Sequence, residues 1–281
     1  MDTNAINFIN RVGTKLPSLP TIYQEITAAV DDPNSSISEI GTIVRKDQSL
    51  ASRLLKLANS AMYSFPSQIE TIEEALQLIG LREMRDLALA TTVISTFSKL
   101  PQNLVNPIDF WKHSIACGTA AAMIAERRFD PAPERFFVGG LMHDIGRLIM
   151  YLFAAKESTE ILARYDRENA TACRIERDVL GFDHTALGGE LLATWKLPAK
   201  LVELVRLHHA PPKIATPADD GTVHCADFLI SAVGIGNSGE TVVQPLSEEA
   251  YKNCLIEDAS LEEIATQTEE RCEQIFAILA K

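Results

Sequence analysis

The chain has few cysteines and no long uninterrupted apolar run. Its five cysteines are an odd number without C-x-x-C spacing, which argues against a disulfide framework or a structural zinc site and favours free buried thiols in a reducing compartment. Charged residues interrupt every apolar run before the roughly 20 residues that cross a bilayer. The first residues, MDTNAINFINRVGTK, do not have the pattern of an export signal. We therefore predict a cytoplasmic protein that does not enter membranes.

Positive charge is also scarce. The chain has 26 Lys and Arg against 38 Asp and Glu, a net charge of −12, which disfavours an extended contact with a nucleic-acid backbone. A local basic cluster is formed by Arg45-Lys46 and by Arg53 with Lys56, on two predicted helices whose spacing resembles a helix-turn-helix. The alternative is that these residues are the solvated faces of amphipathic helices, and it agrees better with the acidic balance. Nucleic acid is not an expected partner.

Helical periodicity runs through the whole chain, and no convincing strand or internal repeat interrupts it, so the predicted fold class is all-α. Residues 16–100 predict five short helices, with capping boxes at Ser36–Glu39 and Thr71–Glu74. The proline-bounded stretch 100–107 is the predicted boundary. We expect two subdomains. Residues 1–100 form a five-helix bundle, and it packs on a C-terminal helical bundle formed by residues 101–281.

The C-terminal part predicts further helices separated by two loops. The loops are expected at 213–222 and at the glycine-rich 234–245, which has no periodic pattern and is predicted to be mobile. The helices are expected at 109–127, 136–152, 156–169, 172–180, from 184 after an Asp183 cap, from 198 to 209, at 223–233, and at 260–279 after a capping box that begins at Ser260.

The stretch from Phe136 to Ile149 is apolar on most of its surface, yet His143 and Asp144 lie in its middle. Burying a carboxylate without a partner costs several kcal/mol, so Asp144 requires a hydrogen-bonding or cationic partner or a metal ion. The preceding pair Gly139-Gly140 has no side chains and would let another helix approach closely. This stretch is the predicted centre of the molecule.

Other imidazoles and carboxylates also lie on apolar helices, and histidine with carboxylate suits Fe, Mn, Ni or Zn better than calcium. The full candidate set is His113, His143, Asp144, His184, His208, His209 and Asp227. The alternative is that each group has a local partner: Asp144 pairs with Arg147, and the histidines bind nearby carbonyls. The residues alone leave both possibilities open.

A series of short motifs follows one another from Leu16 to about Pro212. They are Leu16-Pro17-Ser18-Leu19-Pro20, Leu54-Leu55-Lys56-Leu57-Ala58-Asn59-Ser60, Ile72-Glu73-Glu74-Ala75-Leu76, Trp111-Lys112-His113-Ser114, Gly140-Leu141-Met142-His143-Asp144-Ile145-Gly146-Arg147, Gly188 to Trp195, and His208-His209. In these motifs the chain resembles the HDOD module, a helical relative of the HD phosphohydrolase superfamily found in bacterial signal-transduction proteins. The resemblance covers about 70% of the chain in the right order.

The resemblance implies roles for the candidate set. His113, His143, Asp144 and Asp227 would be the basic ligand set, with His184, His208 and His209 available for a second ion. Asp144 would then bridge two ions, and Arg147 would steady a phosphate group. The family implies a regulatory module that acts through signalling protein partners, with a metal-capable pocket that could take a phosphate-bearing or nucleotide ligand.

The competing interpretation is a metal-dependent phosphohydrolase or cyclic-dinucleotide phosphodiesterase in which Asp144 and Arg147 are catalytic. The relatives that hydrolyse cyclic dinucleotides carry Gly-Tyr-Pro after their paired histidines, where this chain has Ala210-Pro211-Pro212. They also usually carry a lysine where this chain has Arg147, which keeps the charge but not the compact ammonium. Both interpretations predict that one pocket collects the imidazoles and aspartates.

Overall fold

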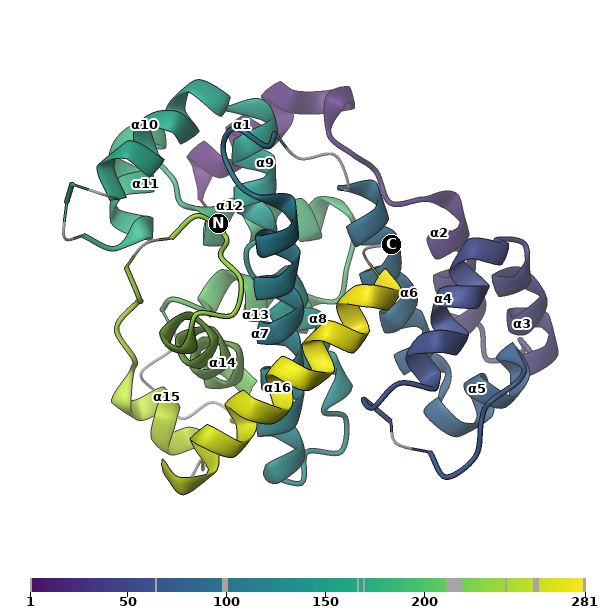
Figure 1. The fold of residues 1–281 in the computed structure, drawn as a ribbon. Coiled ribbons are helices and arrows are strands. Elements are labelled where there is room, and N and C mark those ends of the chain that lie inside the picture. The colour runs from purple at the N-terminus through teal and green to yellow at the C-terminus, as the bar shows by residue number, and fades with distance from the viewer. Residues whose placement is uncertain are drawn as a thin grey trace. The chain divides into compact units, whose positions relative to one another are not determined.

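The computed structural model describes residues 2–63, 65–97, 101–165, 167–168, 170–210, 219–240, 242–254 and 258–279. All regular structure in these residues is helical, which confirms the predicted fold class (Figure 1). Contacts group the chain into two units, Met1–Pro17 with Lys99–Glu269, and Ser18–Ser98 with Glu270–Lys281. The boundary that the sequence places at residue 100 stays a prediction.

The unit that contains residues 18–98 has the five helices predicted there. They are α2 (Thr21–Asp31), α3 (Ile37–Arg45), α4 (Gln48–Ala58), α5 (Ile72–Ile79) and α6 (Leu81–Thr96). Ser36 and Glu39 form the predicted capping box. In the basic cluster, Arg45 pairs with Glu73, and Lys46 Nζ lies 2.6 Å from Glu25 Oε2, as expected for ion pairs on the surfaces of amphipathic helices.

The other unit holds the central stretch and the candidate residues. Its elements are α1 (Thr3–Val12), the 3₁₀ turn η1 (Gly13–Lys15), α7 (Pro107–Arg127), α8 (Glu134–Met142), α9 (Ile145–Phe153), α10 (Ala155–Tyr165), α11 (Ala172–Leu180), α12 (His184–Thr194), α13 (Ala199–Leu207), α14 (Asp219–Val233), α15 (Glu248–Asn253) and the part of α16 (Asp258–Leu279) up to Glu269. The last helix begins before Ser260, so the capping box predicted there is wrong. Residues 219–222 of the predicted loop are helical, and residues 213–218 lie outside the described part.

Glycines set the spacing of the central helices. A Cβ added to Gly140 would lie 2.6 Å from the Gly118 Cα, so the backbones of α7 and α8 touch there. Gly139 meets Leu204 of α13 in the same way, at 2.7 Å from its Cδ1. These contacts confirm that Gly139-Gly140 permits close helix approach, and they draw α7 and α13 against α8, which ends at His143 (Figure 1).

The predicted continuous helix over 136–152 is wrong at one point. The structure has two helices, α8 and α9, that are separated by a turn at His143 and Asp144. Asp144 has φ −95° and ψ 12°, outside the helical range, and its carboxylate does not cap α9. The backbone bend therefore occurs at the pair of residues that carries the predicted chemistry.

The stretch Glu134–Phe153 has the length and hydropathy of a membrane span, although the sequence interpretation found no such run. In the structure 89% of its apolar window is buried inside the protein, as in a core helix. The five cysteines are buried thiols that form no disulfide bond, as predicted.

The close contact between α9 and α12 predicts how a methyl group added at Gly146 changes the stability of the fold. A Cβ at Gly146 would overlap the carbonyl oxygen of His184 and lie 2.8 Å from Gly188 N, both backbone atoms that cannot move aside. Gly146→Ala should therefore lower the free energy of unfolding by about 1–3 kcal/mol in urea titrations. Gly41→Ala on α3 is the matched control, because the atoms it meets first belong to the flexible Glu73 side chain. We expect it to stay within about 1 kcal/mol of wild type, and equal effects of the two substitutions would contradict the packing argument.

Candidate metal centre

The seven predicted metal ligands come from five places in one unit and meet in its interior. His113 lies on α7, His143 and Asp144 form the turn between α8 and α9, and Asp227 lies on α14. His184 is the first residue of α12, and His208-His209 directly follow α13. All are buried except His209, which is partly exposed. The structure therefore brings together every residue of the candidate set.

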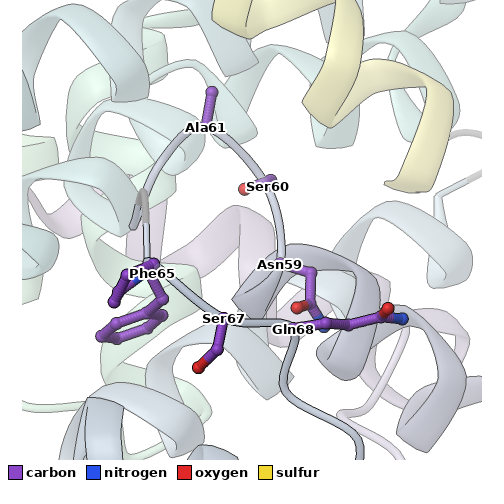
Figure 2. A pocket seen from close by; sticks show the side chains of 7 residues that line it. Asn59, Ser60, Ala61, Phe65, Ser67 and Gln68 are labelled. Carbon is purple, nitrogen blue, oxygen red and sulfur yellow. The ribbon is translucent and has the colours of Figure 1, made fainter.

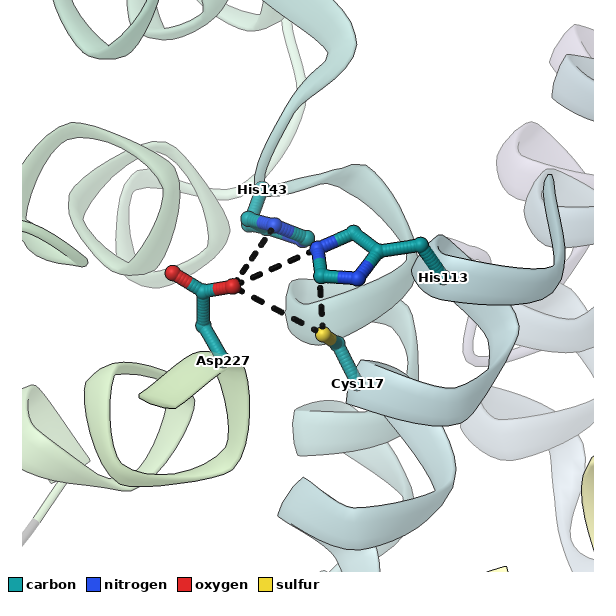
Figure 3. A group of neighbouring side chains, drawn as sticks. All are labelled: His113, Cys117, His143 and Asp227. Carbon is teal, nitrogen blue, oxygen red and sulfur yellow. Dashed lines mark hydrogen bonds and ion pairs between the residues drawn. The ribbon is translucent and has the colours of Figure 1, made fainter. Parts of the chain in front are cut away.

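The first group contains His113, Cys117, His143 and Asp227, whose ligand atoms lie within 4.8 Å of one another (Figure 3). Asp227 Oδ1 lies 3.3 Å from His113 Nε2 and 3.7 Å from His143 Nε2. Cys117, one helical turn after His113, places its Sγ 3.6 Å from His113 Nε2. The sequence predicted only a free buried thiol here, and the structure places its sulfur among the possible ligand atoms of this group.

The second group contains Asp144, His184, His208 and His209. Asp144 Oδ1 lies 3.3 Å from His184 Nε2 and 3.9 Å from His208 Nε2. The two imidazole nitrogens are themselves only 3.3 Å apart. Two neutral imidazole nitrogens that face each other repel through their lone pairs unless a proton or cation lies between them. This spacing therefore suits a proton or a metal ion that both nitrogens bind.

Both aspartates connect the two groups. Asp144 directs Oδ2 toward His143 Nε2, at 3.3 Å, while its Oδ1 faces His184. Asp227 directs Oδ1 toward the first group and Oδ2 toward His209 Nδ1, at 3.7 Å. Each carboxylate can therefore offer one oxygen to each side, as a ligand bridging two cations requires.

Backbone carbonyls hold two of the histidines in the orientation that a metal needs. His143 Nδ1 donates to Gly140 O at 2.6 Å, and His208 Nδ1 donates to Val205 O at 2.7 Å. A carbonyl only accepts, so each Nδ1 carries the proton and each Nε2 faces the centre. The local partners that the sequence offered as an alternative to metal binding thus exist, but they leave the Nε2 atoms available.

The sixth histidine of the chain is a structural residue outside the cluster. His224 Nδ1 donates to His208 O at 2.6 Å, and its Nε2 accepts from Ser247 N at 2.9 Å. Burial lowers the pKa of His224, so it stays neutral while it fixes the backbone next to His208.

Glu176 on α11 orients His184 and was not among the predicted site residues. Its Oε2 accepts from His184 Nδ1 at 2.6 Å and from His184 N at 2.8 Å, and its Oε1 accepts from the Tyr165 hydroxyl at 2.9 Å. Burial opposes ionisation, but His184 and Arg147 hold the pKa of Glu176 at about 2. Its position three residues after the buried Cys173, on the same helix face, was the available sequence signal.

Arg147 is fully buried and is surrounded by carboxylates. Its Nε lies 3.0 Å from Asp144 Oδ1, one terminal nitrogen lies 2.7 Å from Glu240 Oε1, and Glu176 is 3.9 Å away. Glu240 comes from the segment 234–245 that was predicted to be mobile. In the structure this segment is tied down by Asn237 N, which donates to Asp109 O at 3.0 Å, and by the Tyr151 hydroxyl, which donates to Ser238 O at 2.7 Å.

The cluster contains an excess of negative charge that alters its protonation. Burial lowers the pKa of His143, but Asp144 and Asp227 outweigh burial and raise it to about 9. Burial opposes ionisation of Asp144 too, yet Arg147 and His143 hold its pKa well below the usual range. Burial and the neighbouring imidazoles lower the pKa values of His208 and His209, so both are neutral and able to ligate.

These residues fit a divalent metal ion. Among the described residues, His143 Nε2, both Asp144 oxygens and both His209 nitrogens are buried without a hydrogen bond of acceptable geometry. Buried polar atoms left unsatisfied cost about 1–3 kcal/mol each, and a cation in their midst would remove that cost. Nitrogen and oxygen donors suit Fe, Mn, Ni or Zn.

A pocket of about 420 Å³ lies in the unit that contains residues 18–98, in the loop between α4 and α5 (Figure 2). Its polar groups serve the loop itself. Asn59 donates to Leu55 O and Ile69 O and accepts from Ile69 N, and Ser60 donates to Leu57 O. Asn59 and Ser60 thus hold the backbone of the loop, in contrast to the unsatisfied atoms of the histidine cluster.

Comparisons with known proteins give matches over most of the chain. A family model described as HDOD domain matches residues 16–211. An uncharacterised protein of Treponema pallidum (strain Nichols) is 27% identical over 205 residues, and the match covers 70% of this chain but 38% of that relative. The chain therefore spans well under half the length of the curated relative it matches.

Three solved structures share the fold. An HDOD domain protein of unknown function from Geobacter sulfurreducens is 25% identical, with a TM-score of 0.78 and 98% and 97% of the two chains covered. A Shewanella amazonensis SB2B protein with the provisional name phosphohydrolase is 23% identical, with a TM-score of 0.77 and coverage of 99% and 98%. A Marinobacter aquaeolei VT8 protein, provisionally named a signal transduction protein, is 18% identical, with a TM-score of 0.73 and coverage of 99% and 65%.

The hydrogen bonds of Glu176 predict its effect on metal affinity. Glu176→Gln should weaken divalent-metal binding by about 10–100-fold, because it removes the carboxylate that holds the His184 ring and its tautomer. Competition with a chromogenic chelator would measure the change. Asp178→Asn on the same helix is the control, since its carboxylate forms a surface pair with Arg164. Unchanged affinity in Glu176→Gln would show that His184 needs no such support.

The charge balance predicts proton release on metal binding. The raised pKa of His143, about 9, means that Nε2 is protonated at pH 7 and must lose its proton before it can ligate. Affinity should therefore rise with pH between about 6 and 9, by up to tenfold per unit for each proton released. Calorimetric titrations in buffers of different ionisation enthalpy would count the protons. An affinity independent of pH over this range would contradict the protonated state assigned to His143.

Proposed function

The chain belongs to the HDOD domain family, and on that basis we propose that it is a signal-transduction domain whose buried centre holds divalent metal. The domain passes its signal by contact with another protein, and the centre binds a small phosphate-bearing ligand. The family match and the provisional name of the Marinobacter protein support the signalling role. The geometry of the histidine cluster supports the metal and the ligand.

The observation that carries the proposal is the position of the two aspartates between two sets of imidazoles. Asp144 Oδ1 and Oδ2 face His184 and His143 respectively, each at 3.3 Å, and neither oxygen has a hydrogen bond of acceptable geometry among the described residues. A domain that used this region only as packing would be more stable with apolar side chains there, because buried charges are costly. The cluster is better explained by a ligand that uses these atoms.

A second candidate function is metal-dependent phosphoester hydrolysis, and it is favoured by the complete ligand set. When bound, divalent metal would lower the pKa of a coordinated water and polarise a phosphoryl oxygen. His113, His143, Asp144 and Asp227 would hold the first position, and His184, His208 and His209 would complete the second. The provisional name of the Shewanella protein points to the same chemistry.

The metal content of the protein is the first test, because both functions require it. We expect protein purified without chelator to contain one or two divalent ions per chain by elemental analysis, and Asp144→Asn to lose at least one of them. Glu203→Gln removes an exposed carboxylate from α13 and should leave the metal content unchanged. Absence of bound metal in wild type, even after Mn or Fe is added, would overturn the metal centre.

Hydrolysis is then assayed with the loaded protein against cyclic dinucleotides, nucleotides and a generic phosphodiester. Turnover that Asp144→Asn reduces by about 100-fold or more would establish the second candidate, because that carboxylate faces both groups. Retained metal without turnover would leave the regulatory domain as the function.

A further inference from the structure

A cavity of about 300 Å³ leads toward the first group of the metal centre. Its lining includes His113, Ser231, Asn237 and Glu240. The volume is at the lower end of the range for small-molecule sites. Ser231 Oγ donates to Asp227 Oδ1 at 3.3 Å, so the cavity reaches the hydrogen-bonding surroundings of two candidate metal ligands.

The outer part of this cavity is less polar than its floor. Val242 and Val243 contribute to the lining, and Val243 is 40% exposed. Val233, which precedes the lining residue Gly234, is 49% exposed. Exposed aliphatic side chains around a mouth with a polar interior suit an organic molecule that enters with its polar end first.

The wall between this cavity and Arg147 contains Glu240. Its carboxylate lies 2.7 Å from the Arg147 guanidinium and accepts from Gln244 Nε2, also at 2.7 Å. The Arg147 side chain is 1% exposed, and among the described residues none of its three nitrogens has a hydrogen bond of acceptable geometry. Arg147 is therefore a buried cation whose N–H donors are not fully used, and the Glu240 carboxylate lies between it and the cavity.

The segment that precedes Glu240 is held in place by close contacts and hydrogen bonds. A Cβ at Gly236 would overlap backbone atoms of Asp109 and His113, and one at Gly239 would overlap the Tyr151 hydroxyl. Asn237 Oδ1 accepts from Gly239 N at 2.6 Å, and its amide donates to Glu240 O at 2.8 Å. The backbone up to Glu240 is thus anchored, so exchange of the Arg147 partner requires rotation of one side chain.

We infer that Arg147 is an anion site occupied by the chain's own Glu240, and that a small phosphoester reaches the metal centre through this cavity by replacing that carboxylate. A phosphate group can accept two parallel hydrogen bonds from a guanidinium, which the Glu240 carboxylate does not do here. Glu240 then determines specificity, since only an anion that competes with it for Arg147 is admitted. The inference rests on the proposed ligand class of this centre.

Inorganic phosphate tests the inference without metal or turnover. The protein is kept in chelator, and phosphate binding is measured by calorimetry. Glu240→Gln should raise the affinity at least about tenfold, because the competing charge is removed from a charge-assisted contact. Glu248→Gln, which removes an exposed carboxylate from α15, is the control and should match wild type. The gain should disappear in the double variant with Arg147→Gln.

Equal phosphate affinity in wild type and Glu240→Gln would overturn the inference, as would a gain that survives Arg147→Gln. If Glu240→Gln unfolds, Glu240→Asp keeps the charge but shortens the reach, and it should bind phosphate more tightly than wild type. An unchanged affinity in Glu240→Asp would then be decisive against the inference. Metal content is measured separately, so loss of the metal centre and failure of the anion site are distinguishable.

Discussion

The structure depends on two aspartates that are buried among imidazoles. Asp144 and Asp227 are 1% and 3% exposed, and each is within ion-pair distance of several histidines. An isolated carboxylate in such an interior would take up a proton, but the surrounding positive partners keep both pKa values below the usual range. Close packing at Gly140 and Gly146 brings these partners near enough, so the glycine contacts and the charge cluster belong to one arrangement.

Much of this arrangement was predictable from the sequence because its signals are local. Apolar periodicity identifies the helices, and Ser36–Glu39 marks a helix start by side chains three residues apart. A histidine or aspartate on an apolar helix, such as His113 or Asp227, is recognisable as buried from its neighbours alone. Convergence of these residues is different, because it depends on contacts between helices far apart in sequence. The prediction that these residues converge therefore came from the resemblance to a known family.

The missed features have a weaker local signal or none. Glu176 lies on a polar helix, and Glu240 follows a glycine-rich segment, and both settings are typical of exposed carboxylates. Their burial is decided by His184 and Arg147, which come from other elements. The break between α8 and α9 is equally invisible, because His143 and Asp144 interrupt an apolar pattern that continues on both sides. Hydrophobic periodicity indicates which face of a helix is apolar, but it does not indicate where one helix ends and the next begins.

The balance of charge among the buried carboxylates, the imidazoles and Arg147 gives a reason for Glu176 and Glu240 to be present. Asp144, Glu176 and Glu240 place three carboxyl groups around a single guanidinium, that of Arg147, and Asp227 adds a fourth carboxyl group among the imidazoles. Protons on imidazoles can balance part of the excess, as the raised pKa of His143 indicates. Divalent metal would balance the same charge and displace those protons. A phosphate that replaced Glu240 at Arg147 would leave this balance nearly unchanged, so metal and anion could occupy the interior together at little electrostatic cost.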